Sequence, residues 1–509
     1  MKKVEGIPVP NLDTDEIHRL WVLFATVLVP FTIFECIVFY YIYYGKRQLG
    51  ESESGSHSRS IELKVSQSSP QKKEPEHAIS ASEPEPCLLT ENENIEKDAT
   101  DSKGLRNSNA EDTSISIRHE QVLVRTETNI NHELCSEFTD LLPKRMDAIE
   151  GLRIIGAIHI VLFHFYTFEK QKRMCNPCKQ GQYWVHVYYM ITGLVSYKSC
   201  SRTNTPYGGL RLLERRLKTL YPMVFLSCLL TYIGKISANI YVTSITVQRV
   251  IFLVSTFTPP FGEARALNGP SWFIGTLTVY WVALPHWCCA AKRASGKGLA
   301  IMLLLLYIAT WAPHVCWYGI LDLEWRNYGR GTWILQGMVN FSPYTNWWHV
   351  AFGVCLAAGL DRFKIGKARD LLEKVGASLG VIALTIFIAL HKQVHRDIPD
   401  LYRMLINGPF SYPILTVLFI GCTQLKDPAA RVLKVMGRWG KYALPLYLLH
   451  YPINNFLRSG GGCPEVCVEN QGALFYFVLL PACLIVGTVI GAMLQDKWVS
   501  YISPKKKQR

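Results

Sequence analysis

Apolar residues occur along most of this chain in long runs rather than in short alternations. Many of the runs are about 18–25 residues long, which is the length that an α-helix needs to cross roughly 30 Å of hydrocarbon. The pattern predicts an all-α polytopic membrane protein, in which a ten-helix transmembrane bundle is joined to one extra N-terminal transmembrane helix. The extra helix is expected at Leu20–Tyr44, and the other segments begin near Gly151, Tyr183, Leu220, Trp272, Leu299, Trp347, Val375, Gly408, Leu444 and Ala473.

The apolar pattern stops between residues 47 and 145, where Ser, Glu, Lys and Pro are frequent. Such a segment buries too little apolar surface to offset the entropy of ordering, so we expect a long disordered linker. The expected organisation is an N-terminal transmembrane helix at 1–46, the linker at 47–145, a ten-helix domain at 146–498 and a basic tail at 499–509. A weaker apolar stretch at 240–257 is interrupted by Arg249 and is expected on or near the membrane surface.

The formal net charge is +14, but the basic residues form no single stripe and no nucleic-acid motif is present. Lys and Arg instead gather in alternate loops, with about 24 in one set and about 13 in the other, which places the first set in the cytosol. On this orientation the linker and the C-terminus are cytosolic, and the N-terminus lies on the lumenal or extracellular side. The expected partner is therefore the lipid bilayer and not nucleic acid.

Two pairs of cysteines differ from the rest of the fifteen, most of which lie in apolar segments. Cys175 and Cys178 occur in "MCNPCKQ", and Cys463 and Cys467 occur in "GGCPEVC". Both pairs fall in loops on the predicted non-cytosolic side, where disulfides persist, so we expect structural bridges within or between these loops. The sequence leaves the pairing open. No metal site and no bound cofactor is predicted.

One apolar segment carries two costly side chains on the same face. Arg153 and His164 are eleven residues apart in "IEGLRIIGAIHIVLFH", so they differ by only about 20° around a helix and by about 16 Å along it. Arg153 lies at the predicted cytosolic mouth and His164 lies deeper in the membrane. His159 points about 140° away from His164. Ionisable residues inside a membrane helix indicate a functional site, although lipid snorkelling by Arg153 and a helix-tying role for His164 remain open.

The chain contains, in this order, the stretches "IEGLRIIGAIHIVLFH", "LERRLKTLYPMVFL", "PSWFIGTLTVYWVALP" and "LYLLHYPI". Together they resemble the integral-membrane acyltransferase-3 family. The segment "IEGLRIIGAIHIVLFH" is similar to its first helix, whose signature is an arginine, ten residues and a histidine. The others are similar to its Arg-Arg…Tyr-Pro segment, its Trp-led helix that ends in proline, and its penultimate helix with a histidine. They are "LERRLKTLYPMVFL", "PSWFIGTLTVYWVALP" and "LYLLHYPI", and together the four span about Met146 to Trp498.

The resemblance implies transfer of an acyl group, often acetyl, from acyl-CoA as cosubstrate to a hydroxyl of a carbohydrate or lipid acceptor on the far side of the membrane. On this reading the catalytic residues are His164, as the general base, and Arg153, and the supporting residues are His450 and Trp272. Basic residues at the cytosolic boundary suit the phosphates of acyl-CoA, although they also fit a role as positive-inside anchors. The candidates for binding acyl-CoA are Arg153, Arg215, Arg216 and Lys218.

The chain departs from the family pattern at a few positions. Leu277 and Thr278 stand where many members carry glutamate, Thr219 stands where a second arginine is usual, and Pro445 precedes "LYLLH" in place of Ser or Thr. A catalytically inactive acyltransferase-like protein is therefore one alternative. A polytopic transporter is another, because intramembrane histidine and arginine also occur in proton relays.

The last residues suggest a compartment. Lys506 and Lys507 lie at positions four and three from the predicted cytosolic C-terminus and resemble a dilysine retrieval signal. The alternative is an ordinary basic tail next to the membrane. We expect a multi-pass protein of the endoplasmic reticulum or Golgi membrane.

Overall fold

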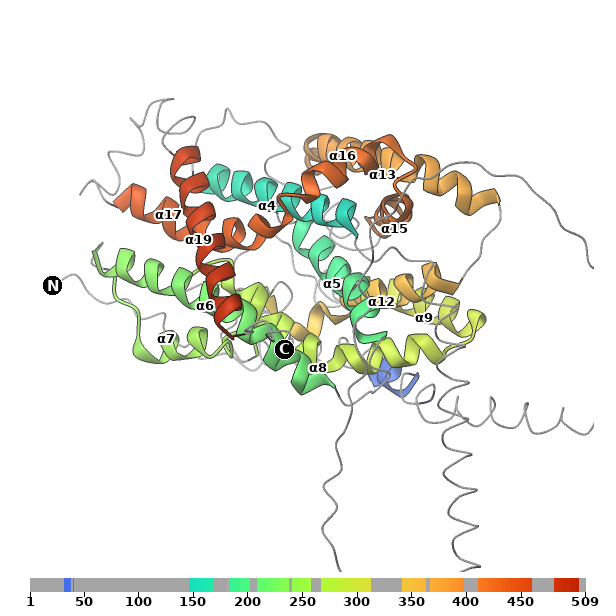
Figure 1. Ribbon diagram of the computed structural model, residues 1–509, viewed down its shortest axis with the longest axis horizontal. Coiled ribbons are helices and arrows are strands. Elements are labelled where there is room, and N and C mark those ends of the chain that lie inside the picture. Colours follow the sequence, from blue (N-terminus) through green and yellow to red (C-terminus); the bar gives the residue numbers. More distant parts are fainter. Residues whose placement is uncertain are drawn as a thin grey trace, which may run out of the picture. The chain divides into compact units, whose positions relative to one another are not determined.

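The computed structural model describes residues 32–37, 40, 146–168, 181, 183–201, 208–237, 240–257, 267–312, 341–362, 367–397, 411–459 and 480–502. All regular elements in these ranges are helices, as expected for the all-α class (Figure 1). The longer ones are α4 (Asp147–Phe168), α5 (Tyr183–Ser201), α6 (Gly209–Ser237), α8 (Ser271–Arg293), α9 (Gly296–Ala309), α12 (Trp347–Arg362), α13 (Lys367–Asp397), α15 (Ser411–Gln424), α17 (Ala443–Ser459) and α19 (Leu480–Ile502). Short elements are α7 (Ser244–Ile251), α16 (Pro428–Gly437), η4 (Pro343–Thr345) and η5 (Gly440–Tyr442).

Four helices within the described ranges are both long enough and apolar enough to cross a bilayer. They are α6, α8, residues Lys367–Ile388 of α13 and residues Pro481–Ile502 of α19. A membrane location is therefore supported, whereas the predicted total of ten crossings and the extra N-terminal crossing stay predictions. The predicted linker, the four loop cysteines and the two terminal lysines all lie outside the described residues.

Some helices begin earlier than the hydropathy pattern predicts. The sequence predicts the start of a segment near Leu220, but α6 begins at Gly209, so the basic residues at 211–218 form its first turns. Leu, Arg, Lys and Glu are good helix formers, so the helix continues beyond the apolar segment into the boundary region. The ambiguous stretch at 240–257 contains only the eight-residue α7, whose N-cap Thr243 accepts a hydrogen bond from the Thr246 backbone.

Glycine residues allow the helix backbones of this bundle to come into direct contact where they cross. A Cβ atom on Gly193 of α5 would lie 2.0 Å from the Val350 carbonyl oxygen of α12, and one on Gly353 of α12 would lie 2.1 Å from the Met190 carbonyl oxygen of α5. The α13–α15 crossing follows the same rule, because a Cβ atom on Gly421 would lie 2.0 Å from the Ala377 nitrogen. Small residues that let backbones touch are the usual basis of helix association in lipid, where apolar burial alone gives little driving force.

Pro222 interrupts the hydrogen-bond ladder inside α6. A proline has no N–H, so the carbonyl oxygen of Lys218, four residues earlier, loses its usual partner. The indole nitrogen of Trp498 in α19 donates a hydrogen bond of 2.7 Å to this oxygen. The Trp498 side chain thus replaces the missing backbone donor in α6 and joins α19 to α6.

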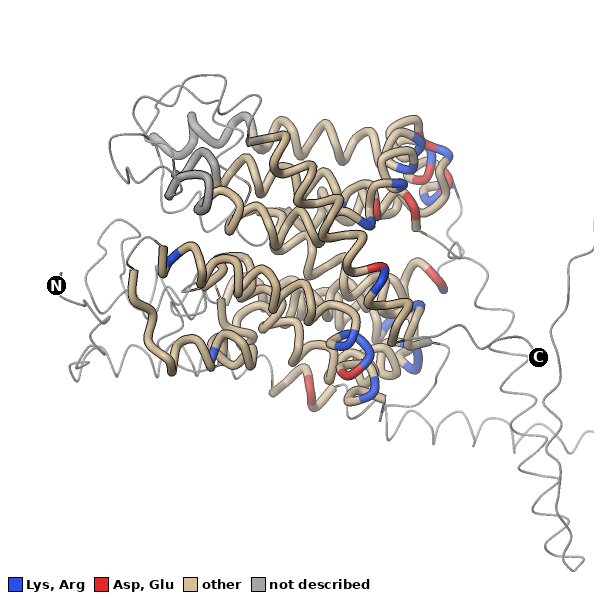
Figure 2. The backbone as a smooth tube through the Cα atoms, turned by 60° about the vertical axis from the view of Figure 1, so that its left-hand side comes forward, with Lys and Arg blue, Asp and Glu red and all other residues tan. Residues whose placement is uncertain are grey.

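Charged residues gather mainly at one end of the long helices (Figure 2). At the α12–α13–α15 corner of this end, the buried Arg369 pairs with Glu373 at 2.7 Å and also donates to the Leu360 carbonyl oxygen. Lys426 adds a second cation to Glu373 at 2.8 Å. An asymmetric charge distribution of this kind is expected of a membrane protein whose basic loops share one side.

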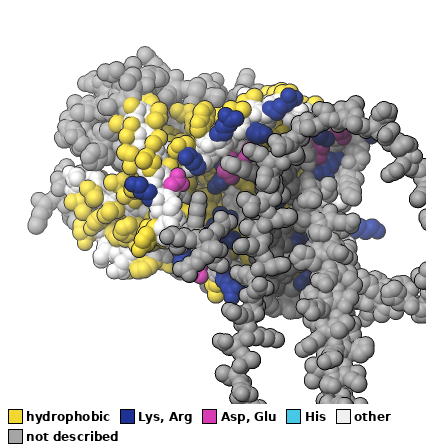
Figure 3. Space-filling model, viewed as in Figure 1, with side chains coloured by type: hydrophobic (Ala, Val, Ile, Leu, Met, Phe, Trp, Pro, Cys, Tyr) yellow, Lys and Arg dark blue, Asp and Glu magenta, His cyan; other side chains and the backbone are white. Residues whose placement is uncertain are grey.

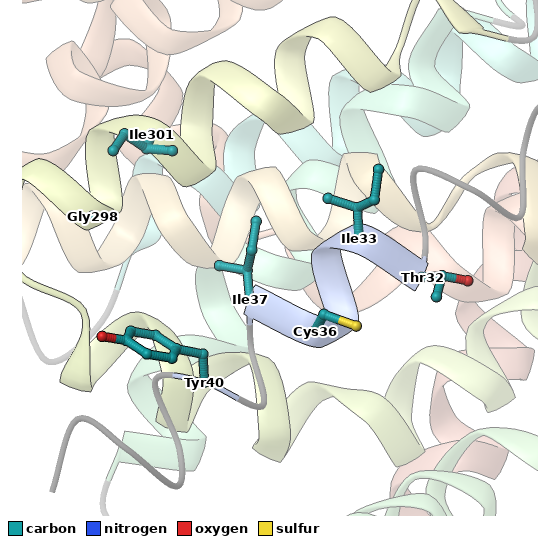
Figure 4. Close-up of a pocket in the computed structure, with 7 residues that line it drawn as sticks. All are labelled: Thr32, Ile33, Cys36, Ile37, Tyr40, Gly298 and Ile301. Atoms are coloured by element: carbon teal, nitrogen blue, oxygen red, sulfur yellow. The ribbon is translucent and has the colours of Figure 1, made fainter. Parts of the chain in front are cut away.

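The described part of the N-terminal segment, residues 32–37 and Tyr40, packs against the helical domain. Phe34 is buried, with its ring 5.0 Å from Trp347 and 6.2 Å from Trp287. The Trp287 indole also donates a 2.8 Å hydrogen bond to the Glu35 carboxylate, so this partly buried acid has a partner. An apolar pocket of about 430 Å³ separates the segment from α9 (Figure 4) and is lined by Thr32, Ile33, Cys36, Ile37, Tyr40, Gly298 and Ile301.

Candidate active site

His164 lies on the last turns of α4 and faces α17. Its ring centroid is 5.0 Å from that of His450 and 6.3 Å from that of Tyr451, and the neighbouring Phe163 ring lies 5.3 Å away. The side chain is half-buried. The structure therefore brings together the two histidines that the sequence singled out, one from each end of the helical domain, although neither catalytic role is tested by this proximity.

His450 is completely buried in α17. Its Nδ1 atom lies 3.2 Å from the Leu446 carbonyl oxygen, which can only accept, so we assign the ring proton to Nδ1. The Nε2 atom is then an acceptor, and it finds no hydrogen-bond partner among the described residues. An unused lone pair on a buried imidazole next to a second imidazole is a feature expected of a reactive site rather than of a packed core.

Pro452 shapes α17 beside this histidine. It removes the N–H that would bond to the Leu448 carbonyl oxygen, and the Asn268 side-chain amide donates to that oxygen instead, at 3.0 Å. The same amide nitrogen donates to the Ser227 hydroxyl of α6 at 2.8 Å. Asn268 thus ties α17, α6 and the segment before α8 together next to His450.

His159 occupies a different environment from His164. Its Nδ1 atom accepts a 2.8 Å hydrogen bond from the Trp184 indole of α5. This contact, together with the Tyr188 hydroxyl that donates to the Arg153 carbonyl oxygen at 2.7 Å, joins α4 to α5. The geometry agrees with the sequence interpretation that His159 points away from the face that carries His164.

Arg153 does not stand alone at the mouth of α4. Its guanidinium donates to both oxygens of Glu150, one turn earlier, at 3.0 Å each. Glu150 was not predicted as a partner, although its spacing of three residues from Arg153 is the helical spacing at which such pairs meet. The pair is partly exposed, with 42% of the Arg153 side chain and 26% of the Glu150 side chain accessible.

Arg215 and Arg216 extend the basic cluster from the first turns of α6. Arg216 interacts electrostatically with Arg153, Arg215 and Glu150, so it lies near two other arginines and one carboxylate. The Nε atom of Arg216 is buried and has no hydrogen-bond partner in the part of the chain that the structure describes. Close like charges are costly unless an anion is bound, so the cluster is suited to an anionic ligand.

Two predicted site residues have other contacts. Lys218 is exposed and forms an ion pair with Glu214 on the same face of α6, which leaves it less suited to a phosphate. Trp272 is half-buried, and its ring packs against Phe341 at 4.8 Å and against Phe273 at 6.2 Å. These contacts describe a packing residue on α8, and a supporting role for Trp272 stays a prediction.

The structure reveals a second histidine pair that the sequence analysis did not notice. His186 of α5 stacks on His349 of α12 with 4.4 Å between centroids and 22° between ring planes. The Tyr412 hydroxyl of α15 forms a short hydrogen bond with His349 Nδ1. No group of three or more potential metal-binding side chains occurs within the described ranges.

Comparison with known proteins gives one match. A family model described as an acyltransferase domain matches residues 146–493. Neither a curated protein nor a solved structure matches the chain. The matched range covers the His164–His450 pair and the arginine cluster.

Proposed function

This chain belongs to the acyltransferase-3 family, and on that premise we propose that it transfers an acyl group, most often acetyl, from acyl-CoA to a hydroxyl of a carbohydrate or lipid on the lumenal side of the membrane. Family membership supports an acyltransferase. The donor, the acceptor and the side of the membrane belong to the proposal.

The contact between His164 and His450 carries the proposal. In the proposed step the acceptor oxygen attacks the thioester carbonyl carbon, a C–O bond forms, and the C–S bond to CoA breaks. His164 accepts the hydroxyl proton and returns it to the departing CoA thiolate, so atoms and charge balance. A neutral imidazole suits this task near pH 7.

His450 supports the base in this scheme. Because its Nδ1–H points to the Leu446 carbonyl, its Nε2 atom is available to accept an N–H from His164. A centroid distance of 5.0 Å leaves the two rings within reach of such a bond after a small rotation. The Nε2 atom of His450 would orient His164 and stabilise the imidazolium that forms in the transition state, as the carboxylate does in a catalytic triad.

The arginine cluster supports the donor side. Arg153, Arg215 and Arg216 present planar guanidinium groups, which suit phosphates better than a point charge does. Arg216 is the strongest candidate, because its Nε atom is buried and finds no hydrogen-bond partner in the described ranges. We predict that Arg216→Gln raises the KM for acetyl-CoA roughly tenfold or more, whereas Lys218→Gln changes it little because that lysine is exposed and paired. Equal effects of the two variants would contradict this assignment.

The test follows the acyl group. Radiolabelled acetyl-CoA is added to membranes that contain the full-length protein, and these membranes also supply the acceptors. The label in the lipid and glycan fractions and the amount of released CoA are then measured. We expect both products with the wild-type protein and with the His186→Ala control, and neither with His164→Ala. Full turnover by His164→Ala would remove the proposed base, and solute flux without loss of thioester would favour the transporter alternative.

The membrane compartment is a separate part of the proposal. We propose the endoplasmic reticulum or Golgi membrane, with the linker and C-terminus cytosolic and the N-terminus lumenal. The dilysine signal at Lys506 and Lys507 motivates the assignment. Replacement of both lysines by serine should release the protein to the cell surface, and unchanged retention in the endoplasmic reticulum would contradict it.

A further inference from the structure

The short helix α16 has two very different faces. Ala430, Leu433 and Gly437 are buried and point toward the bundle. The opposite surface, which we call the α16 outer face, consists of three apolar residues at helical spacing and the cations between and after them. The apolar residues are Val432, Val435 and Trp439, and the cations are Arg431, Lys434, Arg438 and Lys441.

The inner face holds α16 tightly against α4. A Cβ atom on Gly151 would lie 1.9 Å from the Leu433 carbonyl oxygen, and one on Gly437 would lie 2.1 Å from the Asp147 carbonyl oxygen. Asp427 caps the helix by accepting from the Ala429 backbone, and it also accepts two hydrogen bonds from Ser378 of α13. Close backbone contacts and a buried cap therefore hold the helix against α4 and α13.

The one acid at the start of this helix does not balance the outer cations. Asp427 is fully buried and faces α13. Although burial raises the pKa of this carboxyl, hydrogen bonds from Ser378 and from the backbone of Ala429 and Ala430 hold it below its ordinary value. Its charge is used for capping, so it offers nothing to Lys434 or Arg438 on the other side.

The α16 outer face is both apolar and cationic. Val432, Val435 and Trp439 are exposed by 62%, 53% and 55%, which is unusual for large apolar side chains in water. Lys434 and Arg438 have no ion-pair partner among the described residues, and α16 itself contains no acid. Figure 3 shows cationic and hydrophobic side chains intermixed over this part of the molecule.

We propose that the α16 outer face lies in the membrane interface and binds the headgroups of anionic phospholipids, with Val432, Val435 and Trp439 inserted among the upper acyl chains. The pattern is that of an interfacial helix, in which apolar residues enter the lipid and basic residues meet the phosphates. Tryptophan favours this depth. The charge selects an anionic lipid over a zwitterionic one.

The position of this face links bound lipid to the arginine cluster. Gly440 of η5, directly after α16, is so close to Glu150 that a Cβ atom would lie 2.9 Å from its carboxylate oxygen. Glu150 is the partner of Arg153. A lipid that holds α16 and η5 is therefore one contact away from the predicted donor site, although the binding proposal does not depend on catalysis.

The test is lipid retention by the full-length protein. Native mass spectrometry in detergent, titrated with phosphatidylserine or phosphatidylcholine, measures the number of bound lipids. The variant Arg431→Gln/Lys434→Gln/Arg438→Gln is compared with Arg211→Gln/Lys297→Gln/Lys367→Gln, which removes the same charge from exposed positions elsewhere. We expect wild type and control to retain phosphatidylserine in preference, and the α16 variant to lose affinity for it by at least about tenfold.

Three outcomes would overturn the proposal. They are equal retention of the two lipids by the wild type, equal losses in the two triple variants, and full displacement of phosphatidylserine by millimolar inorganic phosphate, which would indicate a simple anion site. The single variant Trp439→Ser supplies a second check, because the loss of the inserted ring should weaken retention without any change in charge. All substituted side chains are exposed, and an unchanged melting temperature confirms that each variant is folded.

Discussion

The two histidine pairs of this bundle contain the same side chains in different geometries. His186 and His349 stack almost parallel, and Tyr412 occupies the Nδ1 atom of His349. The His164 and His450 rings are tilted by 53°, and the Nε2 atom of His450 has no hydrogen-bond partner in the described part of the chain. A histidine pair is therefore informative about chemistry only when its ring geometry and the hydrogen bonds of each ring nitrogen are considered together.

The residues that surround the two histidine pairs also differ. Around His349 lie parallel and edge-on aromatic rings, with Tyr189 at 6.2 Å and Phe352 against Tyr412 at 4.6 Å. Beside His450 lie Pro452 and the Asn268 amide, a local break in the helix that is repaired from another element. Stacked and edge-on rings dominate the first environment, whereas the second contains a helix break that a side chain of another element bridges.

The largest expected effect separates the pairs by activity. His164→Ala should reduce acyl transfer by about 10²- to 10⁴-fold, as expected for loss of a general base, while the melting temperature changes little because the side chain is half-buried. His349→Ala should do the reverse and destabilise the protein by about 2–4 kcal/mol through a cavity among aromatic rings. Label transfer and thermal unfolding in detergent measure the two effects. A loss of activity in both variants, at equal stability, would remove the distinction.

The next effect concerns His450 and distinguishes an acceptor from a packing residue. His450→Gln keeps an acceptor atom in the side chain and should retain part of the turnover. His450→Leu fills similar volume without an acceptor and should lower kcat by at least about tenfold with little change in the KM for acetyl-CoA. If leucine and glutamine give the same kcat, the histidine only fills space.

A smaller effect is expected at Asn268. Asn268→Ala leaves the Leu448 carbonyl and the Ser227 hydroxyl without their amide partner, which should cost about 1–3 kcal/mol of stability. Because the contact lies two residues before His450, turnover should also fall. Asn268→Gln, which is one methylene longer, serves as a control for the loss of the amide. Wild-type stability of Asn268→Ala would show that the carbonyl finds another donor.

The smallest effect is expected in the second pair. Tyr412→Phe removes one hydroxyl from His349 and keeps the ring, so we expect a loss of about 1 kcal/mol in stability and no change in turnover. Chemical unfolding of the purified protein and the label-transfer assay measure these quantities. A large loss of turnover would instead place the second pair in the catalytic machinery.

Much of the helical arrangement could be predicted from hydropathy alone, because a bilayer demands long apolar segments with internally satisfied backbones. The helix faces of Arg153, His159 and His164 followed from periodicity within one segment. The starts of α6 and α13 were misplaced, since a helix does not end where its apolar residues end. Charge counting likewise indicated one basic side, but not which cations would find acids.

The contacts between distant segments could not be predicted. Asn268 meets Leu448 across 180 positions, and His186 meets His349 through a glycine-closed crossing of α5 and α12. A single sequence shows residue types but not which helices become neighbours. One local signal was available in the sequence. Pro452 has no N–H, so the Leu448 carbonyl, two residues before His450, requires a hydrogen-bond donor from another element.

The Leu448 carbonyl also offers a way to detect changes in helix packing by infrared spectroscopy. The C=O stretching frequency of Leu448 depends on the hydrogen bond from the Asn268 side chain, whereas an ordinary helical carbonyl accepts an N–H of its own helix. Isotope editing at this one position would move its infrared band away from the rest. Any event that pulls α17 from the segment before α8 would then be visible as a vibrational shift, without a probe attached to the protein.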